Sequence, residues 1–143
     1  MKDKYFIDTN IFVYSFDKKS RKKKKISYDI IQVALEDNSG CISSQVIQEF
    51  LNVSSKKFDP PLLIQDSIKY LNSVLVPLCE IYTSADLYIK TLEISEKWKY
   101  SFYDSMIITA ALRTDCSTLY SEDLQHGQKI QSLTILNPFF VSS

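Results

Sequence analysis

The sequence predicts an α/β fold in which helices cover both faces of a parallel β-sheet. Short apolar segments of β-type residues alternate along the chain with segments whose apolar residues repeat at helical spacing. Such alternation is typical of parallel sheets. The length of 143 residues predicts a single domain over residues 1–143, since domains usually contain roughly 100–200 residues. Ligands of these folds bind beyond the carboxyl ends of the strands, so polar residues at those ends are the candidates for function.

The first half of the chain contains two predicted strands and two predicted helices. The elements are, in order, a strand at residues 5–7, a helix around 26–35, a strand at 41–43 and a helix around 46–54. The first strand is a short apolar segment that ends at Asp8, which is typical of a buried strand. The run Asp37-Asn38-Ser39-Gly40 stops the first helix. Pro60-Pro61 limits the second one.

The second half continues the alternation. The elements are, in order, a helix around 64–75, a strand near 76–78, a helix opened by residues 83–86, a helix at 102–112, and strands at 117–120 and 133–136. Thr83 and Asp86 have the spacing of a capping box. Tyr88, Leu92 and Ser95 share one face of the helix that this box would open.

Composition excludes several classes of function. Gly40 and Gly127 are the only glycines, so neither a Walker A loop nor a GxGxxG nucleotide loop is present. The single histidine, His126, excludes HExxH metalloproteases and three-histidine zinc sites. Three widely spaced cysteines without a CxxC motif predict buried free thiols in a reducing compartment. No apolar run approaches 18 residues, and we expect a cytoplasmic protein that does not enter a membrane.

Four acidic residues stand in apolar surroundings. Asp8 and Asp123 follow predicted strands, Glu49 adjoins the apolar face of its helix, and Asp104 lies in the first turn of another; the four are Asp8, Glu49, Asp104 and Asp123. Each has a structural alternative. Asp8 could cap a helix that begins at the next residue, and Asp104 has capping-box spacing from the preceding Ser101. Glu49 could reach solvent, and Asp123 could close a turn.

Together the four acids predict a shared site at one edge of the sheet. Carboxylates gathered in a small volume repel one another and raise at least one pKa. A divalent cation relieves this repulsion, and oxygen ligands without histidine or cysteine favour Mg²⁺ or Mn²⁺. Hydrolysis of a phosphodiester bond is the chemistry that such a site supports.

These residues carry a family resemblance. The segments Phe6-Ile7-Asp8-Thr9-Asn10-Ile11-Phe12, Glu49 within a helix, Asp104-Ser105-Met106-Ile107-Ile108-Thr109-Ala110-Ala111 and Leu119-Tyr120-Ser121-Glu122-Asp123 resemble the PIN-domain ribonucleases. The closest group is the VapC-like toxins of prokaryotic toxin–antitoxin pairs. The match runs in order from about residue 4 to residue 137, and the combination of motifs is more specific than any one of them.

The resemblance implies a three-layer Rossmann-like sandwich with a central parallel β-sheet. It implies an Mg²⁺- or Mn²⁺-dependent endoribonuclease that leaves a 5′-phosphate and a 3′-hydroxyl and that is the toxin component of a type II toxin–antitoxin system. It also implies an RNA substrate, a cognate antitoxin and a homodimer. Asp8 and Asp104 match the acids bound most directly to metal, and Glu49 and Asp123 match the other two. Asn10 and Ser121 match polar positions that orient the pocket. Which of Glu122 and Asp123 faces the pocket stays open.

A basic run precedes the first long helix. Residues 18–25 contain seven of the seventeen basic residues of the chain, although acidic and basic residues balance overall. Basic clusters attract polyanions and give salt-dependent affinity, so Lys22, Lys23, Lys24 and Lys25 are candidates for RNA contact. The alternative is a solvated loop and helix start.

Two other classes of function compete with the nuclease. A signalling receiver domain is also α/β and acid-lined, but it would place a lysine at the end of a late strand, where residues 133–137 have none. A dehalogenase-type phosphatase would need an aspartate at Asn10. A PIN-like module that binds RNA or a partner without cutting is the remaining alternative.

Overall fold

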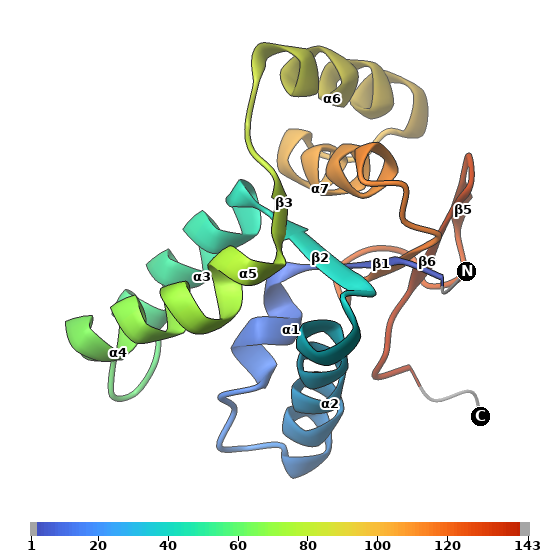
Figure 1. Ribbon diagram of the computed structural model, residues 1–143. Helices are drawn as coiled ribbons and strands as arrows, with labels where there is room; N and C mark the ends of the chain where they lie inside the picture. The colour runs from blue at the N-terminus through green and yellow to red at the C-terminus, as the bar shows by residue number, and fades with distance from the viewer. Residues whose placement is uncertain (1–2, 141–143) are drawn as a thin grey trace.

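The structure is a computed structural model that describes residues 3–140. Its centre is a six-stranded sheet with the order β3-β2-β1-β4-β6-β5 (Figure 1). The strands are β1 (Tyr5–Ile7), β2 (Gly40–Ser43), β3 (Cys79–Ile81), β4 (Thr118–Tyr120), β5 (Lys129–Ile130) and β6 (Leu133–Leu136). All neighbours pair in parallel except β5, which runs antiparallel to β6. The two ends of the predicted domain, residues 1–2 and 141–143, lie outside the described range.

Helices cover both sides of this sheet. They are α1 (Thr9–Tyr14), α2 (Arg21–Asp37), α3 (Ser44–Lys56), α4 (Ile64–Tyr70), the π-helix η1 (Leu71–Leu75), α5 (Val76–Leu78), α6 (Ala85–Trp98) and α7 (Phe102–Arg113). The pair α6 and α7 lies on one side of the sheet, and α1 and α2 lie on the other (Figure 1). The predicted three-layer α/β sandwich with a central parallel sheet is therefore confirmed, except that the edge strand β5 is antiparallel.

Strand β1 lies at the centre and positions the candidate site. It pairs with β2 on one side and β4 on the other, and Phe6 and Ile7 are fully buried. The ladder continues past the strand ends, because the Asp8 N–H donates to the Tyr120 carbonyl at 3.0 Å and the Ser121 N–H donates to the Leu136 carbonyl at 3.0 Å. Asp8 and Ser121 therefore both lie at the carboxyl ends of the paired strands β1 and β4.

The turn from α2 to β2 forms as the sequence predicts. The helix ends at Asp37 because Asn38 adopts the left-handed conformation, with φ of 59°, which asparagine tolerates better than most residues. Gly40 then passes close to its neighbours. A Cβ atom there would lie 2.5 Å from the Ala34 Cβ and 2.7 Å from the Tyr5 ring, so a larger residue would separate α2 from β1.

One predicted strand is misplaced. Residues 76–78 form α5 rather than a strand, and β3 begins at Cys79. The helical path continues through η1 because Leu75 and Leu78 are both buried at a spacing of three residues, which suits a helix and not an alternating strand. Val76, whose type favours β-structure, is exposed instead.

The prediction for α6 is wrong in two respects. Ser84 rather than Thr83 is the N-cap, and its Oγ accepts a hydrogen bond from the Leu87 N–H at 3.2 Å. The buried face consists of Leu87, Thr91 and Ile94, and the predicted face members Tyr88 and Leu92 are exposed. A helix with apolar residues on two faces does not show in its own sequence which face packs against α7.

The state of the cysteines and the absence of long apolar segments were predicted from composition. Cys41, Cys79 and Cys116 are free thiols. Cys41 and Cys116 are buried as predicted, but Cys79 is only half-buried at the edge strand β3. Among residues 3–140, no helix combines the length and the apolar character that crossing a bilayer requires.

Candidate active site

Asp8 is the buried centre of the candidate site. It is the N-cap of α1, and its Oδ1 accepts a hydrogen bond from the Thr9 N–H at 2.7 Å. Its Oδ2 accepts one from the Ser121 Oγ at 2.7 Å. The side chain is only 7% exposed. The capping role that the sequence left open is thus observed, and one oxygen also joins the ends of β1 and β4.

The two residues after Asp8 bind two of the other acids. The Thr9 Oγ1 donates a hydrogen bond to the Glu49 Oε1 at 2.7 Å, and the Asn10 Nδ2 donates one to the Asp123 Oδ2 at 3.1 Å. At the β1–α1 junction, Asp8 therefore contributes one carboxylate, and the next two residues bind the carboxylates of Glu49 and Asp123. Thr9 was not among the candidates predicted from the sequence, although it lies between two residues that were.

The neighbouring carboxylates influence the pKa of Asp8. Burial raises the pKa of Asp8 from its ordinary value of 3.8 to about 7. The hydrogen bonds from Ser121 and Thr9 oppose this rise, while the negative charges of Glu49 and Asp123 add to it. Without a bound cation, burial and the neighbouring charges therefore favour the protonated form of Asp8 far more than in an ordinary aspartate.

Glu122 does not face this site. Its carboxylate accepts hydrogen bonds from the Lys23 Nζ at 2.7 Å and from the Tyr14 hydroxyl. Burial alone would raise the pKa of Glu122, but these two hydrogen bonds and the charge of Lys23 lower it below its ordinary value. Asp123, which binds Asn10, is the acid of this pair that lies toward Asp8.

Asp104 lies in the first turn of α7, on the side of the sheet opposite α1 (Figure 1). Its backbone N–H donates to the Ser101 Oγ at 3.2 Å, so the predicted capping by Ser101 is observed. The Gln45 Nε2 donates to the Tyr103 carbonyl at 3.1 Å. Gln45 and Glu49 are one turn apart on α3, so this hydrogen bond sets the first turn of α7 against the α3 face that carries Glu49.

The structure gathers the predicted acids unequally. Glu49 and Asp123 accept hydrogen bonds from Thr9 and Asn10, the two residues after Asp8, and their charges act on Asp8. Asp104 is half-buried in the first turn of α7. Within residues 3–140, no three histidine, cysteine or acidic side chains are placed as a ready metal cage. The compact cluster of all four acids stays a prediction.

The donor chemistry of this edge nevertheless fits a hard cation. Its groups are carboxylate, hydroxyl and amide oxygens, which Mg²⁺ and Mn²⁺ prefer. Asp8 is an almost fully buried carboxylate beside two further negative charges, and a cation would offset their repulsion. Two buried oxygens that were not predicted from the sequence, the Ser43 Oγ and the Gln45 Oε1, have no hydrogen-bond partner among the described residues. Ser43 ends β2, the strand beside β1.

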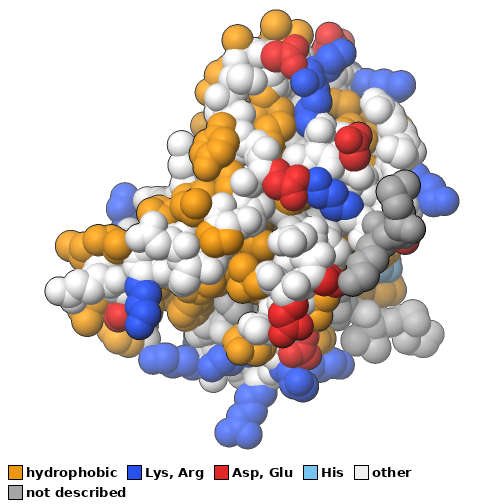
Figure 2. Space-filling model, in the orientation of Figure 1, with side chains coloured by type: hydrophobic (Ala, Val, Ile, Leu, Met, Phe, Trp, Pro, Cys, Tyr) orange, Lys and Arg blue, Asp and Glu red, His pale blue; other side chains and the backbone are white. Residues whose placement is uncertain are grey.

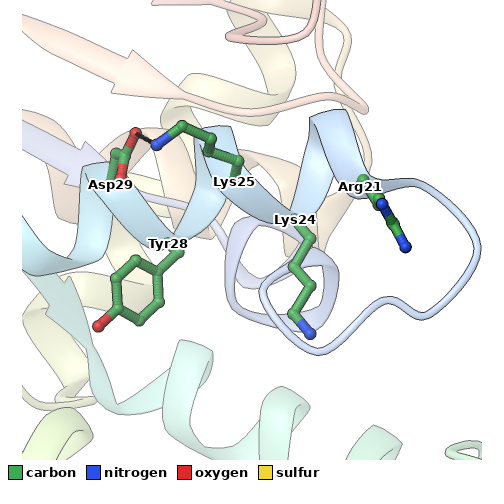
Figure 3. A pocket seen from close by; sticks show the side chains of 5 residues that line it. All are labelled: Arg21, Lys24, Lys25, Tyr28 and Asp29. Atoms are coloured by element: carbon green, nitrogen blue, oxygen red, sulfur yellow. Dashed lines mark hydrogen bonds and ion pairs between the residues drawn. The ribbon is translucent and has the colours of Figure 1, made fainter.

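The four candidate lysines differ in their partners and exposure. Lys23 binds Glu122, and Lys25 forms an exposed ion pair with Asp29 at 3.2 Å. Lys22 and Lys24 are exposed. A surface hollow of about 350 Å³ on α2 is lined by Arg21, Lys24, Lys25, Tyr28 and Asp29 (Figure 3). Figure 2 shows basic side chains around the lower edge of the molecule, where the N-terminal end of α2 lies.

His126 does not extend freely into solvent. Its Nδ1 accepts a hydrogen bond from the Asn137 N–H at 2.9 Å, and its ring stacks on Phe140 with the centroids 4.1 Å apart. These interactions join the loop after β4 to the segment that follows β6. The histidine therefore supports the loop that follows Asp123.

The fold and this edge of the sheet define an α/β protein with an acidic site at the carboxyl ends of its strands. The family model described as "PIN domain" matches residues 5–129. The chain therefore belongs to the PIN-domain family, in agreement with the sequence resemblance. No curated protein matches the sequence.

Solved structures show the same fold at low sequence identity. The VapBC2 complex from Rickettsia felis, bound to a promoter DNA fragment, has a chain that is 22% identical with a TM-score of 0.62; the match covers 92% of this protein and 96% of that chain. A chain of a toxin–antitoxin complex from Klebsiella pneumoniae is 20% identical with a TM-score of 0.64, and the match covers 96% of this protein and 99% of that chain. VapC20 from Mycobacterium tuberculosis, described as a Sarcin-Ricin loop cleaving toxin, is 14% identical with a TM-score of 0.62, and the match covers 83% of this protein and 89% of that chain.

Proposed function

We propose that this protein is a metal-dependent endoribonuclease and the toxin component of a type II toxin–antitoxin system. The observation that carries the proposal is the buried Asp8 carboxylate, held by Ser121 and Thr9 and flanked by Glu49 and Asp123. Membership of the PIN-domain family supports it. So does the description of a similarly folded protein as a toxin that cleaves the Sarcin-Ricin loop.

The proposed site residues are Asp8, Asp104, Glu49 and Asp123. Asp8 and Asp104 are the proposed direct ligands of Mg²⁺ or Mn²⁺, and Glu49 and Asp123 complete the negative site. When bound, such an ion activates water for attack on phosphorus and stabilises the leaving oxygen. The proposed products are a 5′-phosphate and a 3′-hydroxyl.

The protein's own residues then have distinct roles. Ser121 and the Thr9 N–H each occupy one oxygen of Asp8 and fix the orientation of its carboxylate. The Thr9 hydroxyl orients Glu49, and Asn10 orients Asp123. Asp8 loses its proton when a cation replaces it, because metal ligands bind as carboxylates. Cation binding at neutral pH is therefore coupled to proton release.

Exposed lysines provide the proposed RNA contacts outside the acidic site. Lys22 and Lys24 are exposed, and Lys24 and Lys25 line the hollow on α2 beside Tyr28 (Figure 3). Lysines attract phosphate groups, and an exposed tyrosine can stack on a base. Lys23 is engaged with Glu122, so it contributes less to this surface than its neighbours do.

We also propose an antitoxin partner and a homodimer. The similarly folded structures include complexes described as toxin–antitoxin complexes. Two sets of apolar side chains are exposed on this chain: Leu63, Ile64, Ile68 and Val76 around α4, and Tyr88, Ile89 and Leu92 on α6. Helix α4 has seven residues and none is buried. Exposed apolar side chains gathered on one surface favour an assembly in which they are covered. A cytoplasmic location follows from this proposal.

Cleavage of RNA by carboxamide variants tests the proposal. We expect Asp8→Asn and Asp104→Asn each to lower cleavage in Mg²⁺ or Mn²⁺ by more than the roughly 10–100-fold that is typical when a group supporting a ligand is lost, because each removes a proposed ligand. The control is Glu36→Gln, which changes an exposed acid near the C-terminal end of α2, outside the hollow lined by the candidate lysines. Cleavage that persists in both variants would reject the site. Wild-type protein that binds RNA without cutting it in either metal would support the non-catalytic alternative.

A further inference from the structure

A second cluster lies beside the acidic site and holds Glu122. The Lys23 Nζ donates to the Glu122 Oε2 at 2.7 Å, and the Tyr14 hydroxyl donates to the Oε1. Lys23 also lies 4.4 Å from the centroid of the Tyr14 ring, which packs edge-on against the Phe139 ring at 5.0 Å. This cluster joins α1, α2, the loop after β4 and the segment after β6, and the side chains of Lys23 and Glu122 are only 34% and 25% exposed.

Asn10 connects this cluster to the acidic site. Its Oδ1 accepts a hydrogen bond from the Glu122 N–H at 3.4 Å, and its Nδ2 donates to the Asp123 Oδ2 at 3.1 Å. The side chain of Asn10 therefore binds both the backbone of Glu122 and the side chain of Asp123. Fixing Glu122 on the α2 side also fixes the backbone from which Asp123 extends toward Asn10.

We propose that Lys23 is a positioning residue, which together with Tyr14 holds Glu122 on the α2 side and thereby directs Asp123 toward Asn10 and Asp8. Without such a partner, either of the two adjacent acids after β4 could turn toward the acidic site. Of the two, Lys23 binds only Glu122, so Asp123 is the acid that faces Asn10. The charge of Lys23 is used inside the fold rather than on RNA. The relevance to catalysis rests on the proposed function, whereas the placement of Asp123 does not.

The first test measures the placement of Asp123 without any metal. The side-chain amide of Asn10 is followed by NMR in the full-length protein with EDTA. We expect Lys23→Gln to move this signal toward that of a solvated asparagine and Lys23→Arg to keep it near its wild-type position. Lys19→Gln, which removes an exposed cation four residues earlier, is the matched control. An Asn10 signal that is the same in Lys23→Gln and the wild type would overturn the proposal.

Tyr14→Phe provides a second variant that keeps the ring packed on Phe139 and removes only the hydroxyl that binds Glu122. We expect a smaller movement of the Asn10 signal in the same direction. Thermal unfolding of each variant establishes that it is folded. An unfolded Lys23→Gln protein leaves the decision to Tyr14→Phe, for which an unmoved Asn10 signal also overturns the proposal.

The second test measures binding of Mn²⁺ alone by calorimetry. We expect Lys23→Gln to bind Mn²⁺ about tenfold more weakly than the wild type, as is typical when a group supporting a ligand is removed, and Lys19→Gln to bind it equally well. Equal Mn²⁺ affinity in Lys23→Gln and the wild type counts against the proposal. Wild-type protein that does not bind Mn²⁺ would refute the proposed metal site, while the Asn10 signal would still decide the role of Lys23.

Discussion

The hydroxyl of Ser121 donates a 2.7 Å hydrogen bond to the carboxylate of Asp8 across two adjacent parallel strands. Both side chains are buried. Strand β1 supplies the acid and β4 supplies the donor, and the backbone bonds beyond each strand end keep their register. The relationship shows how a parallel sheet brings together residues that are 113 positions apart.

Asp8 makes the stability of the metal-free protein depend on pH. Its pKa is about 7 in the folded protein and 3.8 as its ordinary value, so the folded state binds the proton more tightly. Stability therefore falls as the pH rises from about 4 to about 7, and the loss is complete above that range; it amounts to at most ~4 kcal/mol. We expect Asp8→Asn, which resembles the protonated acid, to unfold at higher denaturant concentration than the wild type at pH 8 in EDTA.

The matched measurement is made at pH 4, where the two proteins should differ little because Asp8 is protonated in the folded wild type. Adding Mg²⁺ at pH 8 should stabilise the wild type more than Asp8→Asn, since a ligand stabilises the state that binds it. If the wild type and Asp8→Asn are equally stable at pH 8 in EDTA, ionisation of Asp8 does not lower the free energy of unfolding, which contradicts the prediction.

Thr9 is expected to affect RNA cleavage through Glu49. Thr9→Val keeps the shape and the backbone N–H that binds Asp8 but removes the hydroxyl that binds Glu49. We expect cleavage to fall about tenfold with a small change in melting temperature. Thr9→Ser retains a hydroxyl and serves as the control. If Thr9→Val and the wild type cleave RNA at equal rates, the hydrogen bond from the Thr9 hydroxyl to Glu49 does not contribute to cleavage.

The exposed lysines are expected to set the salt dependence of RNA binding. Replacing Lys22 and Lys24 together with Gln should reduce the slope of log K against log salt by roughly 0.7 for each phosphate of single-stranded RNA that these lysines neutralise. Fluorescence anisotropy with Asp8→Asn as background measures binding without cleavage. Lys90→Gln, on α6 across the sheet, should leave the slope unchanged. An unchanged slope in the double variant would assign these lysines to solubility.

The α4 surface is expected to mediate the homodimer. Ile68 is 53% exposed on this helix, and Ile68→Glu would place a charge in the proposed interface, where burial is costly. We expect light scattering to give a dimer for the wild type and a monomer for Ile68→Glu. The control Leu92→Glu changes an exposed apolar residue of α6 and should remain dimeric. A monomeric wild type, or a dimer disrupted only by Leu92→Glu, contradicts the assignment.

Local sequence patterns predicted most of the helices and strands correctly. They failed where the same run of apolar residues was compatible with more than one element or more than one buried face. The helix through Leu75 continues to Leu78 because both side chains reach the core. The short strand β5 was missed because two residues carry no periodicity and form a strand only by pairing with β6. Helix α6 has apolar residues on two faces, and packing against α7 selected the face that is buried.

By itself, the sequence determined the alternation of strands and helices, the end of β1 at Asp8 and the capping of α7 by Ser101, because these depend on neighbouring residues. It also contained the family motifs in order. Only the tertiary structure decided that Thr9 binds Glu49 and that Glu122 turns toward α2 while Asp123 turns toward Asn10. Adjacent acids have the same local chemistry, and the direction of each depends on partners that the fold brings from distant parts of the chain.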